Sequence, residues 1–255
     1  MTTPVPLNVF RWGDPKAGRV AVGLHGITAN GGAMTEPARL MAARGWHFIA
    51  PDMRGHGESS RGNGDFSFPS LLADIAGAVP RDPDVLIGHS FGGTLAIQAV
   101  LSGLIAPKVL VLEDPVSHFA DKETPKGMLD WDEVNLPHTI EGIRTLNPGW
   151  SQLDAAWKVV SLTQIDFDDA RAAFAGNAPW DLRGEAEALV RKVPTVWILP
   201  ESSRFIPPSD QARLRAEAGN RAVVALPDVG HSVHRDATEL FVDIVEKLAD
   251  GRWFA

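Results

Sequence analysis

A serine stands at the centre of the segment Gly88-His89-Ser90-Phe91-Gly92-Gly93. The segment has the pattern G-x-S-x-G and joins an apolar run that begins at Asp84 to a helical pattern over Phe91 to Leu104. Glycine at both flanking positions permits a turn so sharp that a side chain there would collide with backbone, and such a turn exposes the hydroxyl of Ser90 at the start of a helix. Ordinary glycine-rich turns can share this pattern, but the strand before it and the helix after it favour a nucleophilic serine.

A serine hydroxyl needs a base to take its proton. Among eight histidines, His231 follows the last apolar run and precedes the final helical pattern. This position predicts that His231 lies at the same end of the sheet as Ser90 and acts as the base. We expect His234 to begin the next helix and His89 to be a packing residue within the turn.

An attacked carbonyl also needs hydrogen-bond donors for the oxyanion that forms on it. The backbone N–H of Phe91, directly after Ser90, is one predicted donor. The second should come from the loop after an early strand, where His25-Gly26 is followed by Ile27. Gly26 would let the backbone approach closely, and the Ile27 N–H is the predicted donor.

The elements that must position these groups alternate between strands and helices. The apolar runs are RVAVGLHG from Arg19, HFIAPD from His47, DVLIGHS from Asp84, KVLVLED from Lys108, PTVWILP from Pro194 and AVVALPD from Ala222. Strands that are apolar at nearly every position are typical of a parallel sheet covered on both faces. Helical patterns lie between them at Met34 to Arg44, Phe68 to Val79, Phe91 to Leu104, Ser209 to Ala218 and Ala237 to Ala249. The sequence predicts an α/β fold with a doubly wound, mostly parallel sheet.

One long segment, 117–192, breaks this alternation. It contains helical patterns at Gln152 to Thr163 and Asp168 to Ala175, and it is too long for a plain loop. We expect a helical cap at 117–192 that lies over the carboxyl ends of the strands. The core domain would then comprise residues 1–116 and 193–255.

Four ordered motifs together resemble the α/β-hydrolase superfamily: LHGITAN, PDMRGHGESS, GHSFGG and VGHSVH. The resemblance is to the branch with a His-Gly oxyanion motif, a G-x-S-x-G turn and a helical cap, and it covers nearly the whole chain apart from the cap. It implies a serine hydrolase. It also implies that Asp52 to Gly57 form a structural turn near the pocket and are not catalytic.

The third member of the expected triad, an acid that orients His231, departs from the family pattern. Most relatives carry an Asp in the loop after the strand that follows the cap, but Ser203 occupies the matching position here. A subset takes the acid from the strand before the cap, where this chain has Glu113-Asp114-Pro115. We predict Asp114 as the acid and keep Glu113 and Glu201 as alternatives.

Composition narrows the class of protein. The 255 residues include no cysteine, and the formal net charge is -8. Disulfides and thiolate metal sites are therefore excluded, and a nucleic-acid partner is disfavoured. We see neither an apolar run long enough for a membrane span nor a signal peptide in Met1 to Phe10, so we expect a cytoplasmic protein without a membrane partner. We expect no cofactor or metal, a small-molecule substrate, and leave a homodimer open.

The cap holds four of the eight tryptophans, Trp131, Trp150, Trp157 and Trp180. Trp131, Trp157 and Trp180 are the predicted substrate-binding residues, although any one of them could belong to the core. No basic cluster lies near the motifs, with Arg204 as the exception. We therefore expect hydrolysis of an uncharged, apolar or aromatic carboxylic ester or lactone. Hydrolysis of a carbon–carbon bond in a diketone-like substrate and a small-molecule receptor on a hydrolase scaffold are the alternatives.

Overall fold

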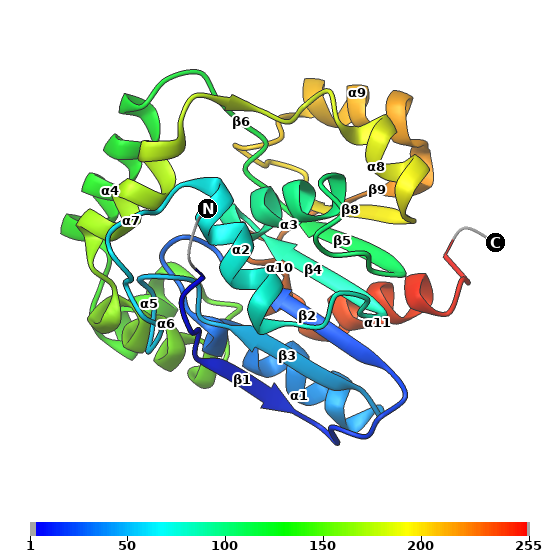
Figure 1. Ribbon diagram of the computed structural model, residues 1–255, viewed down its shortest axis with the longest axis horizontal. Coiled ribbons are helices and arrows are strands. Elements are labelled where there is room, and N and C mark those ends of the chain that lie inside the picture. Colours follow the sequence, from blue (N-terminus) through cyan, green and yellow to red (C-terminus); the bar gives the residue numbers. More distant parts are fainter. Residues whose placement is uncertain (1–3, 254–255) are drawn as a thin grey trace.

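The computed structural model describes residues 4–253; residues 1–3, which belong to the predicted core and to the segment Met1 to Phe10, lie outside the described residues. A seven-stranded sheet with the order β1-β3-β2-β4-β5-β8-β9 forms its centre (Figure 1). Its strands are β1 (Val9–Trp12), β2 (Val20–Leu24), β3 (His47–Pro51), β4 (Val85–His89), β5 (Val109–Glu113), β8 (Thr195–Pro200) and β9 (Val223–Leu226). Strand β1 pairs antiparallel with β3, and all other pairs are parallel. The predicted fold class is confirmed.

Apolar side chains alternate between the two faces of this sheet. Strands β3, β4, β5 and β8 are buried at every residue. In β4, Leu86 belongs to the core layer on one face, whereas Val85 and Ile87 belong to the layer on the other face. Successive strand residues point to opposite faces, so a strand that is covered on both sides is apolar at nearly every position.

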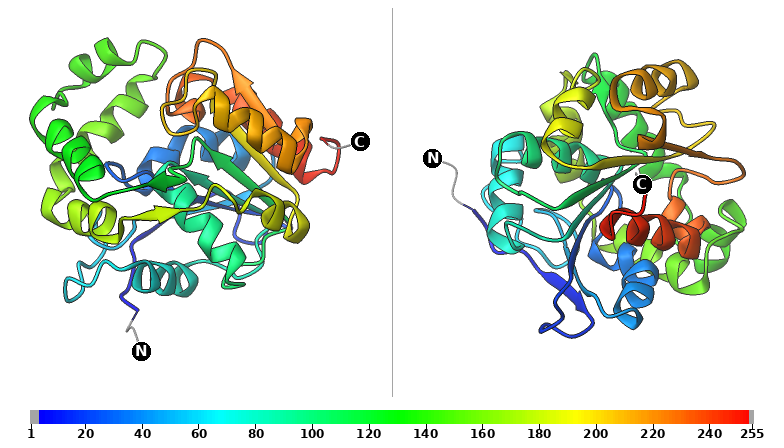
Figure 2. Two further views of the ribbon diagram at one scale, coloured as in Figure 1. Left: turned by 90° about the horizontal axis from the view of Figure 1, so that it is seen from above. Right: turned by 90° about the vertical axis from the view of Figure 1, so that its right-hand side faces the viewer.

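Helices cover both faces. Helices α1 (Thr35–Ala43) and α11 (Thr238–Ala249) pack together on one face (Figure 2, right). Helices α2 (Phe68–Ala78), α3 (Phe91–Leu101), α8 (Ala186–Lys192) and α9 (Pro208–Ala218) form a continuous row of contacts on the other. Short 3-10 helices lie at Gly31–Met34, Ala175–Asn177 and Asn220–Ala222, and α10 (Val233–Asp236) precedes α11.

The remaining helices of residues 4–253 lie in the segment 117–192 and are α4 (Glu123–Asn135), α5 (Ile140–Leu146), α6 (Gln152–Gln164) and α7 (Phe167–Phe174). They gather at one end of the sheet (Figure 1), where α4 packs on α7 and α5 on α6. The last helix of the segment, α8, packs against α3 and α9 instead. We propose α4 to α7 as the cap.

Three strands were not predicted from the sequence patterns, because they are short or lie at an edge of the sheet. Strands β6 (His118–Phe119) and β7 (Trp180–Asp181) form a separate two-stranded ribbon. A two-residue strand shows no periodicity. Strand β1 lies at one edge of the large sheet, and partly exposed residues give it a weaker apolar signal than the central strands. No helix among residues 4–253 is both long and apolar enough to cross a membrane.

Candidate active site

The turn between β4 and α3 has the geometry that its glycines predict. Ser90 has φ 55° and ψ -119°, a left-handed conformation that L residues rarely adopt. A Cβ at Gly88 would lie 2.7 Å from the carbonyl oxygen of Gly92, and a Cβ at Gly92 would overlap the carbonyl of Leu24. The turn is further fixed by the neighbouring strand, since the Ser90 N–H donates to the carbonyl of Glu113 at 3.0 Å.

His231 reaches the site from the loop after β9. Its Nδ1 lies 2.6 Å from Oδ2 of Asp114, and because a carboxylate only accepts, this nitrogen donates. That bond fixes the tautomer in which Nε2 is free to accept a proton. Nε2 of His231 and the Ser90 hydroxyl form no hydrogen bond with each other or elsewhere among the described residues. Such bonds are commonly long in free enzymes and tighten with substrate.

Asp114 follows β5 directly and is buried. Its second carboxylate oxygen accepts from the hydroxyl of Ser203, which in turn accepts from the backbone N–H groups of Phe205 and Ile206 at 3.2 and 2.9 Å. Ser203 therefore holds the acid from the position where most relatives of the resembled family carry it. The side chain of Glu201, the third alternative, is exposed.

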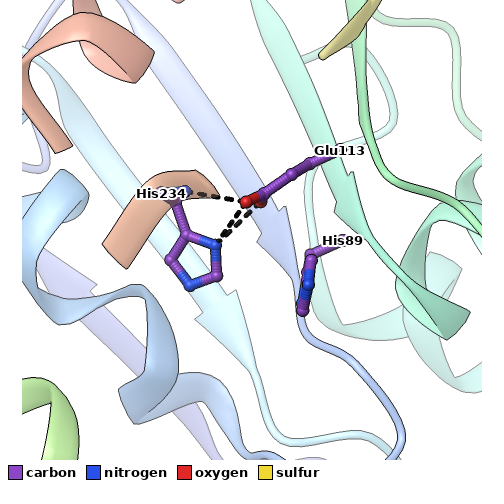
Figure 3. Close-up of side chains that lie close together, drawn as sticks. All are labelled: His89, Glu113 and His234. Atoms are coloured by element: carbon purple, nitrogen blue, oxygen red, sulfur yellow. Dashed lines mark hydrogen bonds and ion pairs between the residues drawn. The ribbon is translucent and has the colours of Figure 1, made fainter. Parts of the chain in front are cut away.

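Glu113 faces a different histidine. Its carboxylate accepts from Nδ1 of His234 at 2.8 Å and from the His234 backbone N–H at 2.7 Å (Figure 3). Burial raises the pKa of Glu113 and lowers the pKa of His234 to about 3, so the imidazole stays neutral. The structure thus brings Asp114, and not Glu113, to His231. His234 lies in α10, as expected.

His89 packs between these two histidines. Its ring lies 4.7 Å from that of His231 and 5.0 Å from that of His234, and its Nε2 donates to the carbonyl of His231 at 3.1 Å. His89, Glu113 and His234 offer ligand atoms within 4.8 Å of one another, as a metal site would require. Both Glu113 oxygens already accept hydrogen bonds from His234, and His89 donates to the His231 carbonyl. These bonds explain the cluster as a structural support for the loop that carries His231.

The predicted oxyanion donors lie on two loops at this end of the sheet. Phe91 is the first residue of α3, so its N–H has no acceptor within the helix. The Ile27 N–H has no acceptor among residues 4–253. Gly26 sits close to Ser90, since a Cβ there would lie 3.2 Å from Cβ of Ser90. Two unpaired donors near a nucleophile are what an oxyanion site requires.

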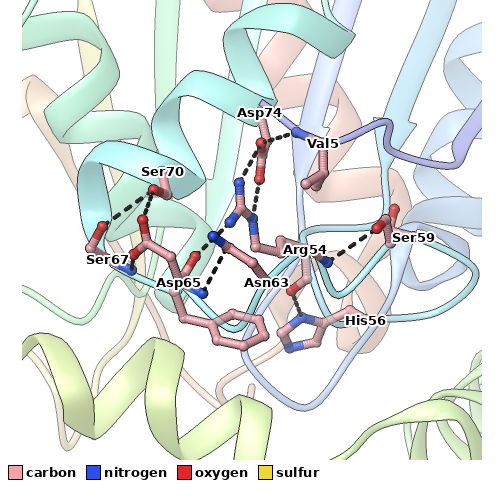
Figure 4. Close-up of polar contacts among 12 residues, drawn as sticks. Val5, Arg54, His56, Ser59, Asn63, Asp65, Ser67, Ser70 and Asp74 are labelled. Carbon is pink, nitrogen blue, oxygen red and sulfur yellow. Dashed lines mark hydrogen bonds and ion pairs between the residues drawn. The ribbon is translucent and has the colours of Figure 1, made fainter. Parts of the chain in front are cut away.

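The turn at Asp52 to Gly57 supports the Ile27 loop from outside. His56 Nε2 lies 2.7 Å from the carbonyl oxygen of Ile27. Arg54 forms a buried ion pair with Asp74 at 2.6 Å, and Asp74 also accepts from the Val5 N–H (Figure 4). These contacts fit the structural role expected for the turn.

A pocket of about 300 Å³ is lined by Ser90, His231, Gly26 and Ile27 together with the helical segment. Most of the apolar lining comes from 117–192 and comprises Met128, Leu129, Trp131, Leu136, Ile143, Leu146, Trp150 and Phe174. A larger groove along α1, α10 and α11 contains neither Ser90 nor His231.

The three tryptophans predicted to bind substrate lie in different places. Trp131 lines this pocket, but Trp157 and Trp180 do not. Trp157 packs on Gly32 and Phe10, and Trp180 is buried in an aromatic cluster with Phe68, Phe119 and Phe174. The spacing of residues along a helix could not show which tryptophan lines the pocket and which is packed in the core. Each tryptophan's environment depends on residues far away in the chain. Trp150, left out of the predicted binding residues, does line the pocket.

Three cations also line the pocket: Lys158, Arg204 and Arg235. Only Arg204 was noted from the sequence. The other two lie on α6 and α10, far from Ser90 in the chain. We expected an uncharged substrate because the sequence shows no basic cluster near the motifs. In the folded chain, however, these three cations line the pocket together with Ser90.

Known proteins place the chain in a family. The model of the Alpha/beta hydrolase family matches residues 21–244. The chain is 24% identical to the sn-1-specific diacylglycerol lipase ABHD11 of Mus musculus, over 95% of this chain and 84% of that protein. It is 31% identical to the magnesium-chelatase 30 kDa subunit of Rhodobacter capsulatus, over 88% and 84%.

Among solved structures, an esterase from Exiguobacterium antarcticum is similar with a TM-score of 0.73 at 17% identity, covering 98% of this chain and 100% of that one. The names of these proteins differ, which agrees with the rule that one fold hosts many reactions. The family model spans most of the chain, from strand β2 to helix α11. The chain belongs to the alpha/beta hydrolase family.

Proposed function

We propose that this protein is a serine hydrolase that cleaves a carboxylic ester or lactone through an acyl-enzyme. The observation that carries the proposal is the 2.6 Å contact between His231 and Asp114 at the pocket that Ser90 lines. A histidine oriented in this way can take a proton from the serine, and Asp114 stabilises the cation that forms. The esterase and lipase names among similar proteins agree with this reaction class.

The reaction would proceed in two halves. Ser90 Oγ attacks the ester carbonyl while Nε2 of His231 takes its proton, and the carbonyl oxygen becomes an oxyanion held by the N–H groups of Ile27 and Phe91. The intermediate collapses, the carbon–oxygen bond of the ester breaks, and His231 returns the proton to the leaving alcohol. Water then attacks the acyl-enzyme with His231 as base, which releases the acid and restores Ser90. Each donor would contribute on the order of 3 kcal/mol.

The apolar lining supports an apolar or aromatic portion in the substrate. Pockets of this kind bind by burying apolar surface, and a few polar groups set orientation. Of the three tryptophans predicted to bind substrate, we retain Trp131.

Substitution of the nucleophile tests the proposal. Ser90→Ala should abolish hydrolysis of 4-nitrophenyl esters and covalent labelling by a fluorophosphonate, whereas Ser102→Ala, at a surface serine after α3, should leave both intact. Labelling of another serine, or ester turnover that survives in Ser90→Ala, would refute the assignment. Turnover of a generic aryl ester also separates an enzyme from a receptor on the same scaffold.

A further inference from the structure

Lys158 projects from α6 to the edge of the proposed oxyanion site. Its ammonium donates to the carbonyl oxygen and to the hydroxyl of Thr28, both at 2.8 Å. Thr28 follows Ile27, the proposed oxyanion donor, and both residues line the pocket with Ser90 and Lys158. An ammonium has three N–H donors. Two are used by Thr28, so one remains for a ligand.

The positive charge at this place has no matching acid. Among the described residues Lys158 forms no ion pair with a carboxylate. The pocket lining as a whole contains three cations, Lys158, Arg204 and Arg235, against one carboxylate, Asp132. A charge removed from water without a partner is costly, so such an imbalance calls for an anion from outside the chain.

Arg235 is a buried cation of the same lining, and its ion pair with Asp154 is long. It is 5% exposed, and its nearest carboxylate, that of Asp154, lies 4.0 Å from Nε. This Nε is buried and has no hydrogen-bond partner among residues 4–253. The guanidinium otherwise stacks on the ring of Trp150 at 4.3 Å, and Trp150 also lines the pocket. A buried guanidinium with an unused donor therefore lines the same pocket as Lys158, close enough for the two charges to interact.

The titration of Lys158 is consistent with a cation that lacks its anion. Burial, followed by the nearby charge of Arg235, lowers the pKa of Lys158 to about 7, and Asp132 acts in the opposite direction. Asp132 itself has a raised pKa because of burial, and Lys158, Arg204 and His231 oppose that shift. A carboxylate bound at Lys158 would favour the charged ammonium.

We propose that Lys158, with Arg235 in the same pocket lining, binds a carboxylate of the substrate, so that the preferred substrates are esters or lactones that carry a second, free carboxylate. The inference rests on the proposed hydrolase function. A single remaining N–H on Lys158 suits a monoanion, and the apolar lining suits the hydrocarbon that links it to the reacting carbonyl. Arg204, which is exposed, would attract such anions to the mouth of the pocket.

Paired ester series test the inference. The mono-4-nitrophenyl esters of succinic, glutaric and adipic acid each have a neutral match, the 4-nitrophenyl ester of the unbranched acid with the same number of carbons. The measured quantity is the ratio of kcat/KM for each anionic ester to that for its neutral match. Any disturbance of the Thr28 loop affects both members of a pair and cancels in this ratio.

Lys158→Met should lower the ratio at least tenfold for the best-fitting chain length, mainly through a higher KM for the anionic ester. Lys158→Arg should restore part of the ratio. The control is Lys126→Met, at an exposed lysine of α4 that pairs with Asp130, and it should leave the ratio within twofold of wild type. In the wild type the ratio should fall as the pH rises above about 7, because the ammonium loses its charge, and in Lys158→Met this pH dependence should vanish.

The two possible failures are distinguishable. If Ser90-dependent hydrolysis of the neutral esters is present but Lys158→Met leaves the ratio unchanged for all three chain lengths, the carboxylate subsite is refuted and the hydrolase remains. If neither series is hydrolysed in a Ser90-dependent way, the proposed function is refuted, and the inference, which rests on it, is refuted as well.

Discussion

Nδ1 of His231 lies 2.6 Å from Oδ2 of Asp114, although 117 positions separate the two residues in the chain. Asp114 directly follows strand β5, which pairs with β4 in the register His89 to Glu113. The residues that follow this pair, Ser90 and Asp114, therefore emerge from adjacent strands at one edge of the sheet. The loop after β9 adds His231 at the same edge.

The acid can be identified by comparing two neighbouring carboxylates. Asp114→Asn should lower kcat by about 10³- to 10⁴-fold, because an amide no longer holds His231 in the productive tautomer. Glu113→Gln should lower kcat less than tenfold and should instead cost about 1–3 kcal/mol of folding stability, since it disrupts the buried pair with His234. Steady-state kinetics and urea unfolding of both variants check this. If neither variant loses tenfold in kcat, the acid lies elsewhere.

The contact between Ser203 and Asp114 makes a transfer of the acid possible. In Asp114→Asn combined with Ser203→Asp, a carboxylate returns to the position that most relatives of the resembled family use, directly beside the original one. We expect kcat at least tenfold above that of Asp114→Asn alone. Ser203→Ala in the Asp114→Asn background serves as the control and should recover nothing. Equal rates for the two double variants would contradict the expected geometry.

Two tryptophans of the segment 117–192 should respond in opposite ways. Trp131 is 57% exposed and lines the pocket, so Trp131→Ala should raise KM for long-chain or aryl esters and hardly change the melting temperature. Trp180 is 8% exposed and packs on Phe119 and Phe174, so Trp180→Ala should cost about 3–5 kcal/mol of stability. Steady-state kinetics give KM, and thermal unfolding gives the stability, of both variants. A large loss of stability in Trp131→Ala would argue against its place at the pocket.

Acid should destabilise the fold through His25. Its Nε2 accepts from the Met53 N–H at 3.0 Å and its Nδ1 lies 2.8 Å from the carbonyl of Gly26, so the neutral ring is fully used. Burial lowers the pKa of His25 from 6.5 to about 3. Between these pH values the unfolded state binds a proton that the folded state does not. Stability is therefore complete above about pH 6.5 and falls as the pH decreases toward about 3, by about 1.4 kcal/mol per pH unit for one such group.

Urea unfolding at several pH values between 7 and 4 measures this dependence. His25→Gln should make the slope of stability against pH shallower by about one proton, even if it lowers stability at every pH. His138→Gln, at an exposed histidine of the segment 117–192, should retain the wild-type slope. An unchanged slope in His25→Gln would mean that this ring is not the acid-sensitive group.

The sequence predicts the parts of the site that depend on local backbone geometry. Gly88 and Gly92 specify the turn at Ser90, and the order of buried strands places the following loops at one edge. Asp114 was predicted from the family resemblance, with Glu113 and Glu201 left open, and the contact with His231 singles it out. Contacts between elements that lie far apart in the chain could not be predicted in this way, since Lys158 contacts Thr28 across 130 positions and Glu113 contacts His234 across 121. Nothing in the local pattern around these residues indicates their partners.

The placement of the proposed acid, Asp114, directly after β5 has a consequence for the segment after β8. In this chain that segment supplies Ser203, Arg204 and Phe205, and Phe205 packs on the ring of His231 at 4.9 Å. It does not have to carry the carboxylate of the triad. Its length and charge are therefore free to diverge under selection for ligand choice, while the nucleophile and the acid stay fixed by the ladder between two central strands.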